Sequence, residues 1–578
     1  MHSAARSKGM TWTLRLACLA VILLASGLCL HRLGAVSLWY DEIVQVSLAS
    51  RMSLRDIIRV HLSSAAAPLD PLLSKAVLSL GRAEFVLRFP AACFAILSVA
   101  LCFALGRAMF GSLEGLLAAF LMAISAFHIQ YAQEVRTYAL LGFIGALALW
   151  FLWRALRDDH LRDWAAWTAL GWLGLCAHPF AALWVLAQAC YGVTASAFNR
   201  SIGGSEFWTQ ASRLRRMLVC AGLVLLGAGA QFALAAGDFL KRPAGAAAAT
   251  PSVFDNWIQP VGHLLVQLGN GAWAAFLCLG VILCAFLTSR REDRAAIWLL
   301  GLSGLIPGAL AIIAGRAAFV ARYVIFVLPP WTLLVARGTT GLARTLQARL
   351  QPGPTRNVTW YTVTLALGVA AFGLAGLMRT QEYYTPNPTD WRSKADWRGA
   401  GRYLIDHAEP DALVLANTIS PLSGYGDVWV LECLPYYFPQ AGAGMPFRPA
   451  KQLGRAGQRE TAPGEVWCAV YHPDGLLAPS VLEVDRLEFH KLTLLRSRAG
   501  ETPGAALESV LQGLLELQQT TGGRFELHLA LARVYAGDGQ AGRAERELQA
   551  AREQSLSSLD TEAALATAAA LVRLLLQH

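Results

Sequence analysis

The chain is poor in charged residues. Asp, Glu, Lys and Arg make up 15% of its 578 positions, whereas a soluble domain carries about 25%. The shortage lies between residue 12 and about residue 378, where apolar runs dominate, and the remaining residues have an ordinary composition. A protein that is soluble over its whole length is therefore excluded. The composition predicts one membrane domain followed by a soluble tail.

Two further patterns are missing. None of the eleven cysteines shows C-x-x-C spacing, so a zinc site built from cysteines is not expected. Nine cysteines lie in apolar segments, and the two in the tail, Cys433 and Cys468, either form a disulfide or stay as thiols. The sequence also lacks two matching halves, which argues against the repeat architecture of many transporters.

The net charge of +10 does not indicate nucleic acid as a partner. The basic residues cluster between the apolar segments, where they fit anionic lipid headgroups and the positive-inside rule. We therefore expect the lipid bilayer as a partner and no nucleic acid.

Apolar runs of roughly 20 residues are long enough to cross a bilayer. About eleven are expected, and the first, which has no small-residue cleavage site, is interpreted as a retained anchor. The expected spans are residues 12–31, 89–106, 113–128, 137–153, 164–177, 179–198, 217–237, 271–288, 295–314, 318–336 and 358–378.

Alternate connections differ in their basic residues. With the N-terminus in the cytoplasm, 17 Lys and Arg residues fall inside, against five outside when the long first loop (32–88) is set aside. This bias favours a cytoplasmic N-terminus, and an odd number of spans then leaves the tail outside.

The first outside loop opens with Trp39, Tyr40, Asp41 and Glu42. The aromatic pair is typical of a membrane–water boundary. The two carboxylates either serve a function at that level or cap the following helix, whose N-terminal dipole favours acids. Further along the loop, Lys75 and Arg88 either bind an anionic phosphate or contact headgroups.

A second outside connection, residues 127–138, contains Glu134, Arg136 and Tyr138 between two apolar spans. Charges at membrane depth cost about 2.5–3.5 kcal/mol each on insertion scales, and they mark function by default. A structural ion pair between Glu134 and Arg136 is the alternative. Arg322 and Tyr323 lie at another outside boundary, where an interfacial anchor is the alternative, and His178 is interpreted as a structural residue.

The tail divides into two parts. In residues 379–503, short apolar runs at 412–416, 466–471 and 487–495 alternate with an amphipathic helix around Arg402, which predicts an extracytoplasmic α/β domain. Residues 504–578 show helical periodicity, with small and large residues at the spacing of a tetratricopeptide repeat (TPR). This segment is either a TPR-like surface for a protein partner or a plain helical bundle.

Several motifs together resemble a known family. The segment Trp39–Glu42 resembles the W-x-D-E signature of GT-C glycosyltransferases, of the protein O-mannosyltransferase and aminoarabinose-transferase branch. Four further matches follow in the family's order and extend the resemblance over about residues 10–430. They are Arg88-Phe89-Pro90, the Tyr131/Gln133/Glu134/Arg136/Tyr138 motif, Arg322-Tyr323 with Pro329, and Asp396-Trp397-Arg398 with Tyr403-Leu404.

The resemblance implies a function and a fold. The function is transfer of a sugar from a polyprenyl-phosphate donor, with Asp41 as general base on the hydroxyl of a protein, lipid or glycan acceptor. The implied fold is a mainly α, polytopic GT-C membrane domain, here residues 1–378 with about eleven transmembrane helices. The α/β domain follows it, and the TPR-like segment after that is not part of the family's common core. The chain departs from the family's H-P-P-L in the first loop, where it has Ala66, Ala67, Pro68 and Leu69.

Roles for the other residues follow from the same resemblance. Glu42 and Glu134 would position the acceptor or the sugar, and Arg136, Lys75, Arg88 and Arg322 would neutralise the departing phosphate. A divalent metal, if one is used, would be held by Asp41 and Glu134. The rival classes are a transporter or lipid flippase and a non-catalytic cell-envelope assembly protein.

Overall fold

The computed structural model describes most of the chain. The described ranges are residues 11–63, 67–197, 211–240, 258–315, 320–350, 359–385, 394–410, 412–418, 428–438, 447–450, 465–471, 485–489, 492–497, 503–517, 521–537 and 540–558. By the density of internal contacts the chain forms two units. We call Met1–Ala35 with Gln45–Thr385 the membrane unit and Val36–Val44 with Pro386–His578 the tail unit, and each is described by itself.

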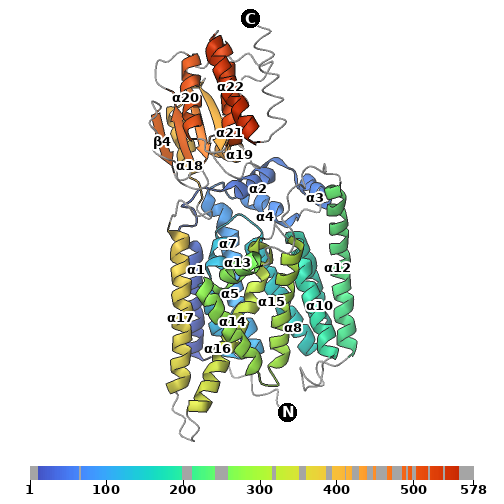
Figure 1. Cartoon of the computed structure of the whole chain (residues 1–578). Coiled ribbons are helices and arrows are strands. Elements are labelled where there is room, and N and C mark those ends of the chain that lie inside the picture. Colours follow the sequence, from blue (N-terminus) through green and yellow to red (C-terminus); the bar gives the residue numbers. More distant parts are fainter. Residues whose placement is uncertain are drawn as a thin grey trace. The chain divides into compact units, whose positions relative to one another are not determined.

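The membrane unit is helical (Figure 1). Helix α2 (Tyr40–Arg51) begins in the tail unit and ends in the membrane unit. The other helices are α1 (Trp12–Leu30), α3 (Leu54–Ser63), α4 (Leu69–Leu78), α5 (Glu84–Met109), α6 (Ser112–Ala123), α7 (Ala126–Ala132), α8 (Tyr138–Asp158), α9 (Leu161–Ala177), α10 (Ala181–Ala197), α12 (Ala211–Leu240), α13 (Ile258–Gly269), α14 (Ala272–Leu287), α15 (Arg294–Gly315), η5 (Ala321–Val327), α16 (Leu328–Leu350) and α17 (Thr359–Tyr384).

The protein is a multi-pass membrane protein, but the expected count of about eleven spans is not confirmed. Among the described residues, seven helices are long and apolar enough to cross a bilayer, or up to nine if each of two bent helix pairs is one span. The segments expected at 164–177 and 179–198 are α9 and α10. Each has 17 residues, which is at the short end of what a crossing requires.

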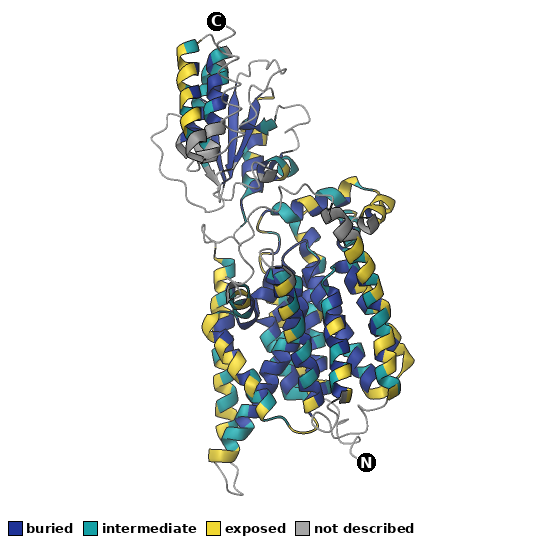
Figure 2. Cartoon of the chain, turned by 45° about the vertical axis from the view of Figure 1, so that its right-hand side comes forward, coloured by how far each residue is buried: buried dark blue, intermediate teal, exposed yellow. Residues whose placement is uncertain are grey.

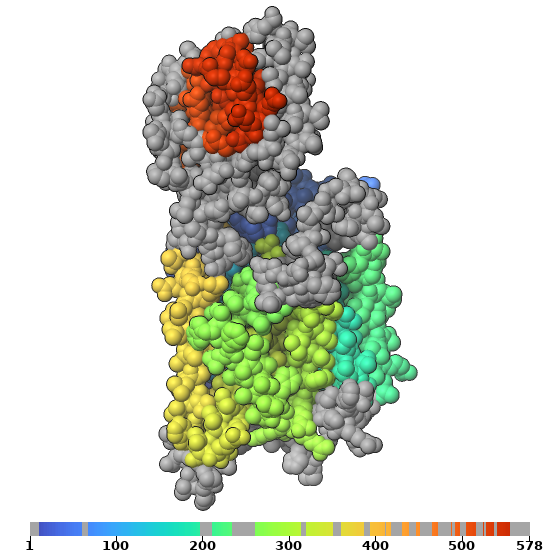
Figure 3. Space-filling view, viewed as in Figure 1, coloured from blue at the N-terminus to red at the C-terminus, as the bar shows by residue number. Residues whose placement is uncertain are grey.

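The spanning helices differ in how they are buried (Figure 2). Each spanning helix contains one most apolar 18-residue stretch. In the helix formed by η5 and α16, 94% of this stretch is buried, whereas the buried share is 11% in α1 and 17% in α17. Large apolar residues of α14 and α17, such as Phe276 and Leu367, are exposed. These helices form part of the face in Figure 3. Such a surface is expected where lipid replaces water as the solvent.

Two pairs of consecutive helices are sharply bent at a short break. Helices α6 and α7 meet at 61°, and α13 and α14 meet at 82°. The second bend is made by Asn270 and Gly271, which have φ values of +59° and +125°, where glycine and asparagine pay the least steric cost. The Asn270 side-chain oxygen accepts a hydrogen bond from the Ala126 N–H at 2.9 Å, which joins the two bends.

The tail unit contains a five-stranded sheet of order β2-β1-β3-β5-β4. The strands are β1 (Leu413–Thr418), β2 (Phe447–Pro449), β3 (Val466–Tyr471), β4 (Asp485–Phe489) and β5 (Leu492–Arg496). Strand β1 is parallel to β2 and β3, whereas β5 is antiparallel to β3 and β4. The apolar run at 487–495 is therefore part of a pair of antiparallel strands.

Helices cover both faces of this sheet. Helices α18 (Trp397–His407) and α19 (Val428–Tyr437) contact it from one side, where Tyr403 packs against Trp467 at 6.1 Å between ring centroids. On the other side one core joins alternate strand residues to α20 (Pro503–Leu517), α21 (Thr521–Gly537) and α22 (Ala541–Ser558). All six residues of β3 are buried, as expected for a strand with two covered faces.

The structure of the tail unit bears on the expected disulfide and on the TPR-like helices. Cys433 and Cys468 are both buried and neither is in a disulfide, so the disulfide alternative is wrong for this structure. The helical hairpin α21/α22 buries Leu531, Tyr535 and Leu548, which belong to the TPR-like pattern. Its assignment as a TPR and the domain boundaries at 378 and 503 stay predictions.

Candidate functional site

The segment that contains Asp41 and Glu42 is held inside the tail unit. The Trp39 carbonyl accepts the first helical hydrogen bond of α2 from Ile43. The Glu42 side chain reaches back to accept from the Trp39 N–H at 3.1 Å, as the third residue of a capping box does. Glu42 is fully buried, and its carboxylate also pairs with the Lys394 ammonium at 3.1 Å.

The residues before Asp41 contact the start of the tail. The Ser37 hydroxyl donates to Asp396 Oδ1 at 3.2 Å and accepts from the Arg398 N–H at 3.1 Å. The same Asp396 caps α18 by accepting from the Gly399 N–H at 2.9 Å. The Leu38 N–H donates to the Tyr437 hydroxyl at 2.7 Å. The W-x-D-E and D-W-R motifs, which lie more than 350 residues apart, therefore form one hydrogen-bonded structure.

Asp41 itself is half-buried in the first turn of α2. Its negative charge acts on Cys433. Burial first, and then the charges of Glu432 and Asp41, raise the pKa of the Cys433 thiol well above its usual value. The thiol is therefore kept protonated.

In the membrane unit, three connections between helices bring their polar side chains together. We call Arg136, Tyr138, His178, Arg322 and Tyr323 the arginine–tyrosine cluster. The guanidinium carbons of Arg136 and Arg322 lie 5.7 Å and 5.4 Å from the ring centroid of Tyr138. The His178 and Tyr323 rings are 5.0 Å apart. Four of these five residues were predicted from separate motifs, and the fold makes them neighbours.

The loop between α7 and α8 is anchored at both ends. The Gln133 side-chain amide donates to the carbonyls of Cys29 at 3.0 Å and His31 at 2.8 Å, and the Thr137 hydroxyl donates to the Ala177 carbonyl at 3.1 Å. Gln133 and Thr137 thus fix the backbone on either side of Glu134 and Arg136. A fixed backbone limits how far the Arg136 guanidinium moves.

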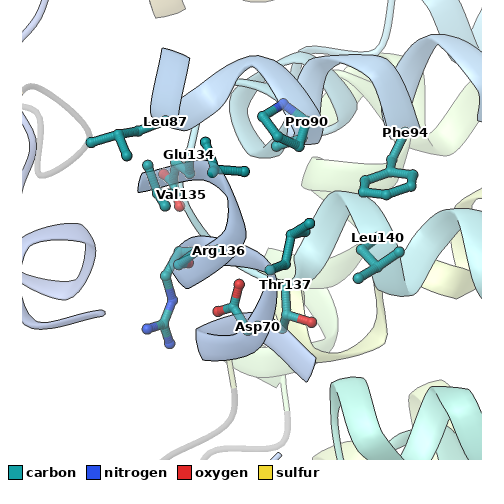
Figure 4. A pocket seen from close by; sticks show the side chains of 13 residues that line it. Asp70, Leu87, Pro90, Phe94, Glu134, Val135, Arg136, Thr137 and Leu140 are labelled. Carbon is teal, nitrogen blue, oxygen red and sulfur yellow. The ribbon is translucent and has the colours of Figure 1, made fainter. Parts of the chain in front are cut away.

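Beside this loop is a small cavity, shown in Figure 4, lined mainly by α4, α5 and residues 134–137. Its volume is about 20 Å³, which is room for roughly one water molecule and not for a sugar. Asp70 and Glu134 line it, and both are almost completely buried. The Asp70 carboxylate also accepts a hydrogen bond from the backbone N–H of Thr137.

Burial and charge shift two groups here in opposite directions. Burial raises the pKa of Asp70 to about 6, and the Arg136 charge and the Thr137 N–H partly offset that rise. Burial, together with the charges of Arg136 and Arg322, lowers the pKa of His178 to about 4, so the imidazole is neutral at pH 7. Because His178 Nδ1 accepts from the Phe180 N–H at 3.1 Å, the neutral ring carries its proton on Nε2.

Lys75 and Arg88 donate to backbone carbonyls. The Lys75 ammonium donates to the carbonyls of Ala49 at 3.1 Å and Met52 at 2.7 Å, at the C-terminal end of α2, where a cation is favoured. The buried Arg88 guanidinium donates to the Leu33 carbonyl at 3.1 Å. Neither side chain is in the arginine–tyrosine cluster.

Sequence reasoning missed two residues of this arrangement and gave little weight to a third. Asp70 lies between two prolines in the first turn of α4, and nothing in that pattern distinguishes it from a helix-capping acid. Lys394 lies two residues before the D-W-R motif, and its partner Glu42 is 352 positions away. His178 was interpreted as structural, although its ring packs against Tyr138 and Tyr323. Only the tertiary contacts identify these three.

The proposed metal ligands can be placed only within their own units. Asp41 belongs to the tail unit and Glu134 to the membrane unit. Among the described residues, no group of three or more His, Cys, Asp or Glu side chains has the geometry to hold a metal ion.

The comparison with protein families agrees with the resemblance that the motifs indicated, over part of the chain. Residues 65–224 match the family model for dolichyl-phosphate-mannose-protein mannosyltransferase. No curated protein sequence matches the chain.

Solved structures with a similar fold include ArnT from Cupriavidus metallidurans bound to undecaprenyl phosphate. It has 13% identity and a TM-score of 0.46, with 85% of this chain and 100% of that chain covered. Another is the oligosaccharyltransferase AglB from Archaeoglobus fulgidus in complex with an inhibitory peptide and a dolichol-phosphate. It also has 13% identity and a TM-score of 0.46, with 79% and 70% covered.

The matched region contains α4, α5, the 133–137 loop and His178, whereas Asp41, Arg322 and Lys394 lie outside it. The membrane unit is polytopic, and over residues 65–224 the sequence is similar to that mannosyltransferase family.

Proposed function

We propose that the protein is a GT-C glycosyltransferase of the protein O-mannosyltransferase and aminoarabinose-transferase type. It transfers a sugar from a polyprenyl-phosphate donor to an acceptor hydroxyl on the extracytoplasmic side, with Asp41 as general base. The Asp41 carboxylate takes the hydroxyl proton while the acceptor oxygen forms a bond to the anomeric carbon. The bond from that carbon to the phosphate oxygen breaks, and polyprenyl phosphate leaves with the electron pair. Attack opposite the leaving group inverts the anomeric configuration.

One observation supports the phosphate half of this proposal more than any other. Two arginines from different loops, Arg136 and Arg322, converge on the ring of one tyrosine. An arginine guanidinium can donate hydrogen bonds to two phosphate oxygens at once. Such a cluster therefore suits a leaving group whose negative charge grows in the transition state. The neutral His178 beside them adds an Nε2–H donor without a third positive charge.

The contacts of the Asp41 segment support the base. Glu42 and Lys394 form a buried pair, and breaking such a pair costs roughly 3–5 kcal/mol. We therefore assign Glu42 and Lys394 to positioning: they hold the start of α2, and with it the Asp41 backbone. Of the two adjacent acids, Glu42 is fully buried and Asp41 is only half-buried.

The orientation is part of the proposal. A cytoplasmic N-terminus and an extracytoplasmic tail follow from the distribution of Lys and Arg between the connections. A divalent metal on Asp41 or Glu134 is a further proposal, and dialysis against a chelator before the assay tests it.

The test uses purified full-length protein and a panel of polyprenyl-phosphate sugars. In Asp41→Asn, donor consumption is expected to fall by about 10²–10⁴-fold, because the variant keeps the shape of the side chain but cannot accept the proton. Asp56→Asn is the matched control, since Asp56 is an exposed acid of the same loop that only caps α3. Equal donor consumption by wild type and Asp41→Asn would refute the base.

A second variant separates positioning from chemistry. Lys394→Met leaves the Asp41 carboxylate in place but removes the partner of buried Glu42. A positioning role predicts a lower kcat with the same pH dependence as wild type, and Lys394→Arg is expected to restore part of the rate. A purely structural role would lower the amount of folded protein and leave kcat of the folded fraction unchanged.

A further inference from the structure

A second polar pocket lies in the membrane unit, away from the arginine–tyrosine cluster. It is formed by the end of α14 and by the part of α16 farther from η5. Helix α16 has 23 residues and rises about 1.5 Å per residue, so its two ends are roughly 35 Å apart. The pocket has a volume of about 380 Å³ and is open to the surface.

Four arginines line this pocket, and its described lining contains no acidic side chain. They are Arg290, Arg337, Arg344 and Arg349. Arg290 and Arg349 are exposed at the rim, Arg344 is partly buried, and Arg337 is almost completely buried. Like charges gathered in a concave site repel one another unless an anion lies among them.

The buried arginine is only partly satisfied. Arg337 Nη2 pairs with Asp293 at 3.0 Å, but its buried Nη1 has no hydrogen-bond partner within the described part of the chain. An unmatched donor of a buried charged group is costly, so such an atom usually has a partner that belongs to a ligand or to water.

The nearby carboxylates do not neutralise all of the arginines that line the pocket. Asp293 is used by Arg337, and Glu114 is used by Arg344 and by the Thr340 hydroxyl. Glu292 approaches Arg290 at 3.8 Å, but both side chains are more than half exposed, and such pairs contribute little. The hydroxyls of Thr288 and Thr345 donate to carbonyls of their own helices, so the arginines are the donors of this pocket.

A glycine keeps the floor of the pocket open. A Cβ at Gly341 would lie 2.9 Å from Arg337 Nη1 and 2.3 Å from Thr288 Oγ1. Any side chain at this position would therefore occupy the space in front of the buried guanidinium. The absence of a side chain gives a small anion access toward Arg337.

We propose that this pocket binds a phosphate group, with Arg337 at the floor and Arg344, Arg349 and Arg290 around it. Arginine suits this ligand because its planar fork matches two phosphate oxygens at once. The phosphate is carried either by the headgroup of an anionic lipid or by a small soluble molecule, since the pocket is open at the end of the helices. This site is separate from the donor site of the proposed function, and its test does not require sugar transfer.

The experiment measures the thermal unfolding midpoint of the purified full-length protein by tryptophan fluorescence. One arm adds inorganic phosphate, with chloride at equal ionic strength as its reference. The other arm adds short-chain phosphatidic acid, with short-chain phosphatidylcholine as its reference. A rise with inorganic phosphate assigns a soluble ligand, and a rise with phosphatidic acid alone assigns a lipid. Either result supports the pocket, whereas no rise over the reference in both arms overturns it.

Variants locate the effect. Arg349→Gln removes one rim donor and is expected to weaken the binding of the active probe about tenfold or more. Arg291→Gln is the matched control, because Arg291 is an exposed arginine next to Arg290 that does not line the pocket. Gly341→Ala, which fills the floor, is expected to abolish the stabilisation. If Arg349→Gln and Arg291→Gln weaken binding equally, the effect is general surface charge and the proposal fails.

Discussion

At the scale of single residues, the candidate site depends on partners that are distant in sequence. Glu42 pairs with Lys394, Ser37 pairs with Asp396, and Arg136 lies beside Asp70. Each pair is buried or half-buried, where charge and hydrogen-bond contributions exceed those at a solvated surface. The same burial explains why neighbouring acids differ. Glu42 is enclosed and structural, while Asp41, one position earlier, keeps part of its carboxylate accessible.

Asp70 gives a prediction about pH. Its pKa is about 6 in the folded protein, above the ordinary 3.8, so folding favours the protonated form. The stability from this group is therefore fully present below about pH 3.8 and is lost as the pH rises through about 6. Asp70→Asn removes that loss. The thermal midpoint of Asp70→Asn minus that of wild type should increase between pH 4.5 and 7.5, by the equivalent of roughly 2 kcal/mol.

The quantity to compare is the difference in thermal midpoint between Asp70→Asn and wild type. The pKa of His178 is lowered, so its contribution to stability changes with pH in the opposite direction, and this contribution cancels when the variant is subtracted. A difference that stays constant over this pH range would contradict the assigned shift of Asp70.

At the scale of helices, close packing depends on glycine. A Cβ at Gly106 of α5 would lie 2.5 Å from the Cα of Gly115 in α6. The two helices touch through their backbones at this point, and Gly111, at φ +142°, makes the turn between them. In lipid, close backbone approach replaces the hydrophobic effect as the main force between helices.

A matched pair of substitutions tests this contact. Gly106→Ala is expected to lower the free energy of unfolding by about 1–3 kcal/mol or more, because the methyl group collides with the backbone of α6. Gly280→Ala in α14 meets no atom within 4 Å and is expected to be neutral or stabilising by up to about 1 kcal/mol. Thermal midpoints in detergent measure both. Equal effects of the two variants would mean that the α5/α6 contact is not close in solution.

At the scale of the whole molecule, the tail is more than a sheet with an appended helical segment. One core joins Leu413, Leu415 and Val470 of the sheet to Leu511 and Leu514 of α20 and to Leu531 of α21. Helix α20 packs on an apolar face of the sheet, and α21 and α22 pack beside it in the same core, so these helices complete the fold of the tail unit. A protein partner bound through these helices would use their outer side.

Removal of this cover has a predictable result. A chain that ends at residue 502 exposes the apolar face of the sheet, and its tail should become sensitive to protease. The milder Leu514→Ala should cost about 2–5 kcal/mol, because Leu514 is fully buried. Glu553→Gln, on the exposed side of α22, is the control and should leave protease resistance unchanged. A truncated tail as resistant as the wild-type tail would instead indicate two independent domains.

Much of this protein is determined by its sequence alone. Long apolar runs must leave water, so the helical membrane unit follows from composition, and short apolar runs separated by a polar stretch predict the small sheet of the tail. The Asp41, Glu134, Arg136 and Arg322 positions follow from polar residues at the ends of apolar runs, where a charge is costly unless it has a use.

Only the tertiary structure decided which of these residues act together. The sequence cannot show that Arg136, Tyr138, His178, Arg322 and Tyr323 meet, because three separate loops are brought to one place by helix packing. It left open whether Glu42 caps a helix, and it did not identify Lys394 as its partner, since a pair 352 positions apart has no local signal. Periodicity and composition report the environment that each residue prefers, whereas contacts depend on how whole helices pack.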